Sequence, residues 1–165
     1  MADSQWKAYA LAAGVFALDR ATKLLIEARV SFESSYTVIP GFFQIVHSEN
    51  RGVAFGIFND STSPWRTPVL AALSVACVAV VAVVLWRMRK QVDALALCGF
   101  ALVMGGAAGN LFDRVTSGRV TDFLLFYIGS YQWPAFNVAD SALDIGAGLV
   151  VLDLLRQKRK AANVS

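Results

Sequence analysis

The stretch Val69–Trp86 (VLAALSVACVAVVAVVLW) contains no charged residue. Its length is close to the roughly 20 residues that an α-helix needs to cross the hydrocarbon core of a bilayer. Thr67 and Pro68 precede it, as an N-cap and a first helical residue would. The whole chain of 165 residues is 56% hydrophobic and only 16% charged, whereas a soluble domain carries about 25% charged residues. The composition therefore excludes a disordered chain and an ordinary water-soluble domain, and it indicates a membrane protein.

Three further apolar stretches approach the same length, at residues 8–26, 94–112 and 137–155. Clusters of Lys and Arg mark the cytoplasmic ends of membrane helices. One such cluster, Arg87–Lys90, follows the second span, and another, Arg156–Lys160, follows the fourth. We therefore expect both termini in the cytoplasm and the two longer connectors, residues 27–68 and 113–136, on the outside.

The outer connectors contain runs that are typical of β-strands. Tyr36–Ile39 and Phe42–His47 are separated by a Pro-Gly pair that suits a type II turn, and Val120–Ile128 is a third run of this kind. We predict one all-α membrane domain over residues 1–165: a four-transmembrane-helix bundle with a small β-rich platform (a β-cradle) on its outer face.

The composition also excludes several classes of function. A net charge of +3 is too small and too scattered for a nucleic-acid-binding surface. The single histidine, His47, and two cysteines cannot build a zinc site with the usual four ligands. We expect no metal, no other cofactor and no nucleic-acid partner.

Two carboxylates are expected at the outer edge of the membrane. Asp122 lies in the second outer connector, and Asp140 lies at the start of the fourth span. Two close carboxylates cannot both ionise easily, and a pair that shares one proton can activate water for peptide hydrolysis. The alternative is structural, because an acid is favoured in the first turn of a helix, and spacing alone favours this alternative. Asp144 lies one turn after Asp140 and is a rival member of the pair.

Two more polar pairs lie four residues apart on predicted helices. Asp19 and Lys23 form either a neutralised pair that tolerates burial or a pair that positions a site. Asn110 and Arg114 point the same way at the outer end of the third span, where they can donate hydrogen bonds to peptide carbonyls, a lipid head group or a carboxylate. An arginine that reaches for interfacial water is the alternative for Arg114.

Five blocks of sequence, taken together, resemble the lipoprotein signal peptidase (signal peptidase II) family over almost the whole chain. They are Asp19–Lys23 (DRATK), Asn50–Phe55 (NRGVAF), Gly105–Arg114 (GGAAGNLFDR), Gly118–Phe123 (GRVTDF) and Phe136–Asp140 (FNVAD). Members of that family are aspartic endopeptidases of the bacterial inner membrane. They remove the signal peptide from prolipoproteins by cutting before a cysteine that carries diacylglycerol.

The resemblance implies a role for each matching residue. Asp122 and Asp140 correspond to the catalytic pair, and Asp19 and Lys23 to the residues that hold the first helix and the platform in place. The residues expected to line the substrate pocket are Asn50, Gly106, Asn110, Arg114 and Asn137. Asp144 and Val53 depart from the family pattern.

The resemblance also implies partners and a location. We expect prolipoprotein substrates, contact with membrane lipids, inhibition by globomycin-type compounds, and a place in the bacterial cytoplasmic membrane, and we expect a monomer. Two other classes of function fit part of the pattern. One is a small proton-coupled transporter that uses intramembrane carboxylates, and the other is a non-catalytic assembly factor that pairs helices through small residues.

Overall fold

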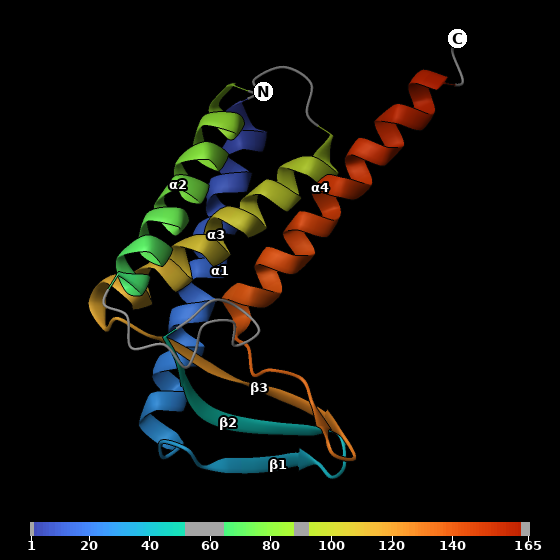
Figure 1. The fold of residues 1–165 in the computed structure, drawn as a ribbon. Helices are drawn as coiled ribbons and strands as arrows, with labels where there is room; N and C mark the ends of the chain where they lie inside the picture. Colours follow the sequence, from blue (N-terminus) through green and yellow to red (C-terminus); the bar gives the residue numbers. More distant parts are fainter. Residues whose placement is uncertain (1, 52–64, 88–92, 163–165) are drawn as a thin grey trace.

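The computed structural model describes residues 2–51, 65–87 and 93–162, and Figure 1 shows their arrangement. The elements in chain order are α1 (Ala2–Arg29), β1 (Ser35–Ile39), β2 (Phe43–Asn50), α2 (Arg66–Arg87), α3 (Ala94–Thr116), β3 (Val120–Ile128), β4 (Tyr131–Gln132) and α4 (Val138–Ala162). The departure at Val53 and part of the Arg87–Lys90 cluster lie outside the described residues.

All four predicted helices are present, and most of their ends extend beyond the predicted bounds. An apolar run marks only the part of a helix that suits a membrane, whereas the helix itself continues to a cap. At the end of α3, the N–H groups of Ser117 and Gly118 donate to the carbonyls of Asp113 and Arg114 at 2.8 and 3.2 Å, and Gly118 has a φ of 71°. This is the left-handed C-terminal cap that glycine favours.

The prediction for the start of α2 was wrong in its details. The helix begins at Arg66, one residue before the expected N-cap. The hydroxyl of Thr67 instead donates to the carbonyl of Gly118 at 3.3 Å. Two helical stretches, Thr67–Arg87 and Ala94–Thr116, are long and apolar enough to cross a membrane, with mean hydropathies of 2.8 and 1.8.

Helix α3 is central and contacts each of the other three helices. Glycines allow these close approaches, because a Cβ atom at Gly99 would lie 2.8 Å from the carbonyl oxygen of Gly146 in α4. On the side of α1, a Cβ atom at Gly105 would lie 2.6 Å from the carbonyl oxygen of Ala12. The polar end of α3 is thereby held against α1 and α4 at once.

The four strands form one antiparallel sheet in the order β1-β2-β3-β4. The expected Pro-Gly turn is confirmed, since Gly41 has a φ of 79° and the N–H of Phe42 donates to the carbonyl of Ile39 at 3.1 Å. The short strand β4 was not predicted. After it, a bridge between Leu124 and Phe136 returns the chain to β3 immediately before α4 begins.

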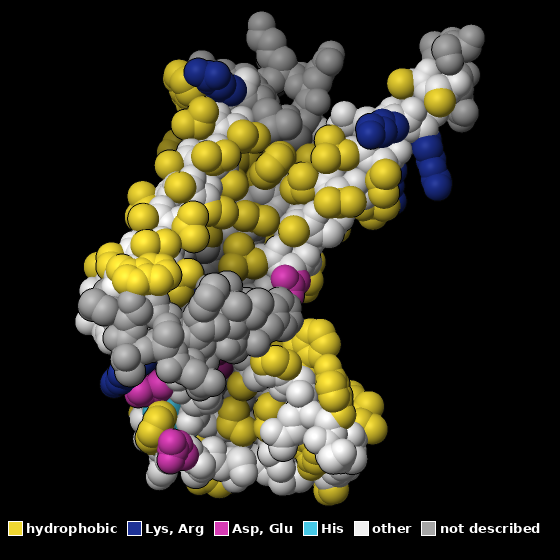
Figure 2. Space-filling model, viewed as in Figure 1, with side chains coloured by type: hydrophobic (Ala, Val, Ile, Leu, Met, Phe, Trp, Pro, Cys, Tyr) yellow, Lys and Arg dark blue, Asp and Glu magenta, His cyan; other side chains and the backbone are white. Residues whose placement is uncertain are grey.

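The sheet lies at one end of the helices, beside the last turns of α1, and both termini lie at the opposite end (Figure 1). Ile26, Val30 and Phe123 form a buried apolar cluster between α1 and the sheet. In Figure 2, hydrophobic side chains cover the helices, and the surface is hollowed between the helices and the sheet. The end of α3, the start of β3 and the start of α4 meet at this junction.

Candidate active site

The structure brings Asp122 and Asp140 to one cavity at the junction of helices and sheet. Asp122 is buried in β3, and Asp140 is half-buried in the first turn of α4. Both line a cavity of about 120 Å³, together with Asn50 and Asp144. The remaining lining residues are Trp133, Pro134, Ala135, Phe136 and Leu143. The two carboxylates that the sequence placed at the outer edge therefore face a shared space.

Asn137 joins the two carboxylates and is completely buried. Its side-chain Nδ2 donates to Asp122 Oδ1 at 2.7 Å. Its backbone N–H donates to Asp140 Oδ2 at 3.2 Å, while its Oδ1 accepts from the backbone N–H of Asp140 at 3.0 Å. The last two bonds form a reciprocal cap of α4, so the cap and the pairing of the two acids belong to one arrangement.

Two further side-chain amides donate hydrogen bonds to the remaining carboxylate oxygens of Asp122 and Asp140. Asn110 Nδ2, from α3, donates to Asp140 Oδ1 at 2.7 Å. Asn50 Nδ2, from the end of β2, donates to Asp122 Oδ2 at 3.0 Å. Every carboxylate oxygen of the pair thus accepts a hydrogen bond from an asparagine of a different segment or from the helix cap.

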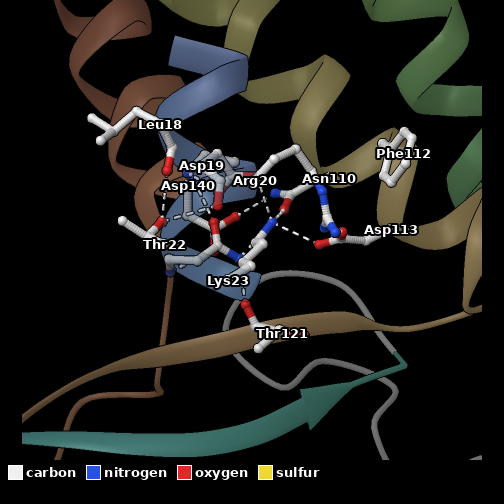
Figure 3. A network of polar contacts seen from close by, with 12 residues as sticks. Leu18, Asp19, Arg20, Thr22, Lys23, Asn110, Phe112, Asp113, Thr121 and Asp140 are labelled. Atoms are coloured by element: carbon white, nitrogen blue, oxygen red, sulfur yellow. Dashed lines mark hydrogen bonds and ion pairs between the residues drawn. The ribbon is translucent and has the colours of Figure 1, made fainter. Parts of the chain in front are cut away.

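Lys23 of α1 is a buried cation, and Figure 3 shows its side chain between α1 and α3. Its Nζ contacts Asp19 Oδ2 at 2.8 Å, Asp113 Oδ2 at 2.7 Å and Asn110 Oδ1 at 3.0 Å. The other oxygen of Asp19 accepts from the backbone N–H of Ala139 in α4 at 2.9 Å. The Asp19–Lys23 pair consequently ties α1 to α3 and to the first turn of α4, and this favours the positioning alternative over mere tolerance of burial.

Asp113 also belongs to this buried network, although its sequence position predicted no role for it. It contacts Lys23 and also forms an ion pair with Arg20, whose guanidinium lies 4.7 Å from the centre of the Phe112 ring. The available signal was its position three residues after Asn110, on the same face of one helix. That spacing was visible within the Gly105–Arg114 block.

The other predicted pocket residues take different positions. Arg114 donates from Nη1 to the carbonyl of Asn110 at 3.3 Å and interacts electrostatically with Asp140 and Asp122. Gly106 is buried in the contact between α3 and α4, where a Cβ atom would meet the backbone of Ala139. It is not among the described residues that line the cavity, so its place in the structure is a close helix contact.

The environment of Asp122 favours its protonated form. Burial, followed by the nearby charge of Asp140, raises the pKa of Asp122 from 3.8 to about 7. The hydrogen bonds from Asn50 and Asn137 oppose this rise. Near neutral pH the site can therefore hold one proton on Asp122 beside the carboxyl group of Asp140, which is the state that acid–base activation of water requires.

Within the described residues, no three His, Cys, Asp or Glu side chains are grouped so that they could hold a metal ion. Cys77 and Cys98 are free thiols in α2 and α3. His47 lies in β2, where its Nδ1 is 2.8 Å from the carbonyl oxygen of Val30. The histidine thus joins the sheet to the segment after α1.

The sequence profile of the family described as Signal peptidase (SPase) II matches residues 11–156 of the chain. The chain belongs to this family. A lipoprotein signal peptidase of Solibacter usitatus is 58% identical over 165 residues, which are 100% of each chain. A lipoprotein signal peptidase of Geobacter sulfurreducens is 42% identical over 153 residues, covering 93% of this chain and 94% of the relative. The signal peptidase II family thus accounts for the five sequence blocks together.

Two solved structures of bacterial membrane enzymes, both obtained by the in meso method, resemble this fold. The first has a TM-score of 0.80 and 30% sequence identity, covering 92% of this chain and 89% of its own chain. The second has a TM-score of 0.78 and 28% sequence identity, covering 90% of this chain and 92% of its own. This signal peptidase II therefore shares its arrangement of long helices and a small antiparallel sheet with solved bacterial membrane enzymes.

Proposed function

We propose that Asp122 and Asp140 together activate a water molecule for attack on the peptide bond before a lipid-modified cysteine. As a member of its family, the chain is an aspartic endopeptidase that removes signal peptides from prolipoproteins. The observation that carries the catalytic assignment is that both carboxylates line one cavity and are bridged by Asn137.

In this mechanism Asp122 is the acid and Asp140 is the base. The raised pKa of Asp122 supports a proton on that carboxyl group near neutral pH. Burial disfavours a negative charge on both carboxyl groups, but Asp140 accepts hydrogen bonds from Asn110 and from the N–H of Asn137 at the start of a helix, and these bonds oppose that effect. Asp140 takes a proton from water as the oxygen attacks the carbonyl carbon, and Asp122 protonates the carbonyl oxygen.

The tetrahedral intermediate then breaks down between the carbonyl carbon and the nitrogen of the cysteine residue. That nitrogen receives the proton held by Asp140, and the O–H proton of the intermediate returns to Asp122. The resting pair is thereby restored, and no covalent bond forms between enzyme and substrate. The nearby positive charge of Arg114 supports Asp140 in its ionised state.

We further propose that all four helices cross the bacterial cytoplasmic membrane as one domain, with both termini in the cytoplasm. Both termini lie at the end opposite to the sheet (Figure 1). Arg87, Arg156, Arg159 and Lys160 fall at or near helix ends on that side, which agrees with the preference of cytoplasmic ends for Lys and Arg. The active site would then lie at the outer edge of the membrane, where a diacylated cysteine is anchored.

The surroundings of the cavity support an apolar substrate. A neighbouring apolar cavity of about 320 Å³ shares Trp133 and Phe136 with the lining of the catalytic cavity. Its other lining residues are Phe42, Phe126, Tyr127, Ile128 and Tyr131.

We propose that the enzyme acts as a monomer in contact with membrane lipids, and that globomycin-type inhibitors compete with substrate for this site.

The decisive experiment uses the purified full-length protein with a diacylglyceryl-modified precursor and its unlipidated counterpart. We expect cleavage of the lipidated precursor only. Asp122→Asn and Asp140→Asn should each reduce cleavage to background while the protein remains folded in detergent. Asp93→Asn is the matched control, because Asp93 is exposed at the far end of α3, and it should cleave like the wild type. Substantial cleavage by either active-site variant would remove that residue from the mechanism.

The proposed topology has its own test. A single cysteine is introduced at Tyr36 in β1 or at Lys160 in α4, after Cys77 and Cys98 are replaced by alanine. In intact spheroplasts a membrane-impermeant maleimide should label the first position and not the second. Labelling at both positions, or only at Lys160, contradicts the proposed orientation.

A further inference from the structure

The catalytic cavity has a third carboxylate in its lining, Asp144. It lies four residues after Asp140 in α4, so both side chains are on the same face of the helix. At a rise of 1.5 Å per residue, the two Cα atoms are about 6 Å apart along the helix axis. Because α4 runs away from the sheet (Figure 1), Asp144 is at the side of the cavity nearer the end that holds both termini.

Within the part of the chain that the structure describes, Asp144 has no internal partner, unlike Asp19 and Asp153. Asp19 is paired with Lys23, and one oxygen of Asp153 accepts from Gln157 at 2.6 Å. Among residues 2–51, 65–87 and 93–162, no hydrogen bond or ion pair to Asp144 is present, and its side chain is exposed. A carboxylate within a membrane span costs at least about 2.5 kcal/mol, and no contact among the described residues offsets that cost.

The proposed topology sets the direction in which a substrate passes Asp144. The amino-terminal part of a signal peptide stays at the cytoplasmic side, so the residues before the scissile bond extend from the cavity toward that side. Helix α4 extends from Asp140 in the same direction, toward the end that we assign to the cytoplasm. An extended peptide covers about 3.3 Å per residue, so Asp144 is level with the residue about two positions before the cut bond.

We propose that Asp144 is a specificity-determining residue that accepts a hydrogen bond from the substrate about two residues before the scissile bond. This inference rests on the proposed function. The carboxylate oxygens of an aspartate accept hydrogen bonds, whereas acyl chains offer no polar group and ester carbonyls offer only acceptors. The partner is therefore a donor on the peptide: a serine or threonine hydroxyl, or the backbone N–H of a segment that has left its helix.

A backbone N–H inside a membrane must find an acceptor when the segment that carries it is not helical. A peptide must adopt an extended form at the bond that is cut, so it presents such donors just before the cleavage site. Asp144 supplies the missing acceptor, and a hydroxyl at the same position adds a second donor. Substrates with serine at this position should then be cut more efficiently than substrates with alanine.

The test compares two diacylglyceryl-modified precursors that differ only in serine or alanine two residues before the cut bond. We expect the wild type to cleave the serine precursor with a kcat/KM about tenfold higher, as one charge-assisted hydrogen bond allows. Asp144→Leu should reduce this ratio to near one, and Asp144→Asn, which keeps an acceptor oxygen, should give an intermediate ratio. Asp93→Asn removes one negative charge far from the cavity and should keep the wild-type ratio.

The ratio between two substrates separates a contact with substrate from a general effect on folding, because loss of folded enzyme lowers both rates equally. An unchanged ratio in Asp144→Leu, or a wild-type ratio near one, overturns the role of Asp144 and leaves the peptidase intact. Failure of the wild type to cut either lipidated precursor would instead contradict the proposed function itself.

Discussion

Asn137 and Asp140 hold each other through two reciprocal hydrogen bonds at the start of α4. Asn137 Oδ1 accepts from the N–H of Asp140 at 3.0 Å, and Asp140 Oδ2 accepts from the N–H of Asn137 at 3.2 Å. The carboxylate that we propose as the catalytic base is thereby also the closing partner of a helix cap. The sequence left a structural role and a catalytic role as alternatives for Asp140. The two roles are thus compatible.

The first prediction separates the two roles of Asn137. Asn137→Ser keeps a cap acceptor for α4 but is too short to replace the 2.7 Å bond from Nδ2 to Asp122. We expect kcat/KM to fall at least about tenfold, because Asp122 loses a donor in a buried site. Asn137→Ala should lose the same activity and, in addition, about 0.5–2 kcal/mol of folding stability with the cap. Ser141→Ala, whose hydroxyl donates to the carbonyl of Asn137, serves as the control in the same turn and should retain activity.

The second prediction concerns the buried cation. Lys23→Met leaves the carboxylates of Asp19 and Asp113 without their shared partner, and breaking a buried pair typically costs about 3–5 kcal/mol. The thermal midpoint in detergent should fall well below that of the wild type. The double variant Asp19→Asn/Lys23→Met should be more stable than Lys23→Met alone, because it removes the charge of Asp19, which Lys23→Met leaves without its ion-pair partner, whereas Asp113 keeps Arg20.

The matched control for this prediction is Lys160→Met, because the side chain of Lys160 is 77% exposed and lies 4.0 Å from its partner Asp93. Exposed pairs of this kind contribute little, so its thermal midpoint should stay near that of the wild type. A Lys23→Met protein as stable as the wild type would show that the network does not hold α1 to α3.

The third prediction uses the space around two glycines. A Cβ atom at Gly109 would lie 2.5 Å from Asp19 Oδ2, whereas nothing lies within 4 Å of a Cβ atom at Gly148. Gly109→Ala should therefore displace Asp19 from Lys23 and lower both stability and kcat/KM. Gly148→Ala, within α4, should be neutral or more stable by about 0.5–1 kcal/mol. Equal thermal midpoints for the two variants would contradict the close approach of α1 and α3.

The sequence predicted those parts of the fold that depend on local patterns. The helices followed from apolar runs, and the hairpin of β1 and β2 followed from a Pro-Gly pair whose glycine has the required positive φ. Strand β4 is only Tyr131–Gln132, too short to show a period. It pairs with β3 because the chain must return to the start of α4, which is a consequence of the tertiary fold.

The same division holds for the site. The pair Asp19–Lys23 was visible because four residues make one helical turn. The contact between Lys23 and Asp113 depends on how α1 packs against α3, so no spacing along the chain could show it. Sequence also could not show that Gly106 lies in the contact between two helices, because a glycine in a motif can serve either substrate access or close packing.

The last prediction concerns pH and the stability of the folded enzyme. The pKa of Asp122 is about 7 in the folded protein and near 3.8 when the chain is unfolded. The unfolded chain therefore releases this proton more readily, and as pH rises from 4 to 7 ionisation of Asp122 favours unfolding by about 1.4 kcal/mol per pH unit. Above pH 7 both states are ionised, and this contribution no longer changes.

Asp122→Asn has no such proton to lose. The free energy of unfolding of Asp122→Asn minus that of the wild type should therefore increase by about 2–3 kcal/mol between pH 5 and pH 8. The cost of the altered hydrogen bonds is present at both pH values and does not affect this increase. Thermal midpoints of both proteins in detergent at the two pH values measure this difference. Asp93→Asn, which removes one exposed carboxylate far from the site, is measured in parallel as the control. A constant offset between Asp122→Asn and the wild type would mean that Asp122 is ionised in the folded enzyme at pH 5, and that it is not the acid of the pair.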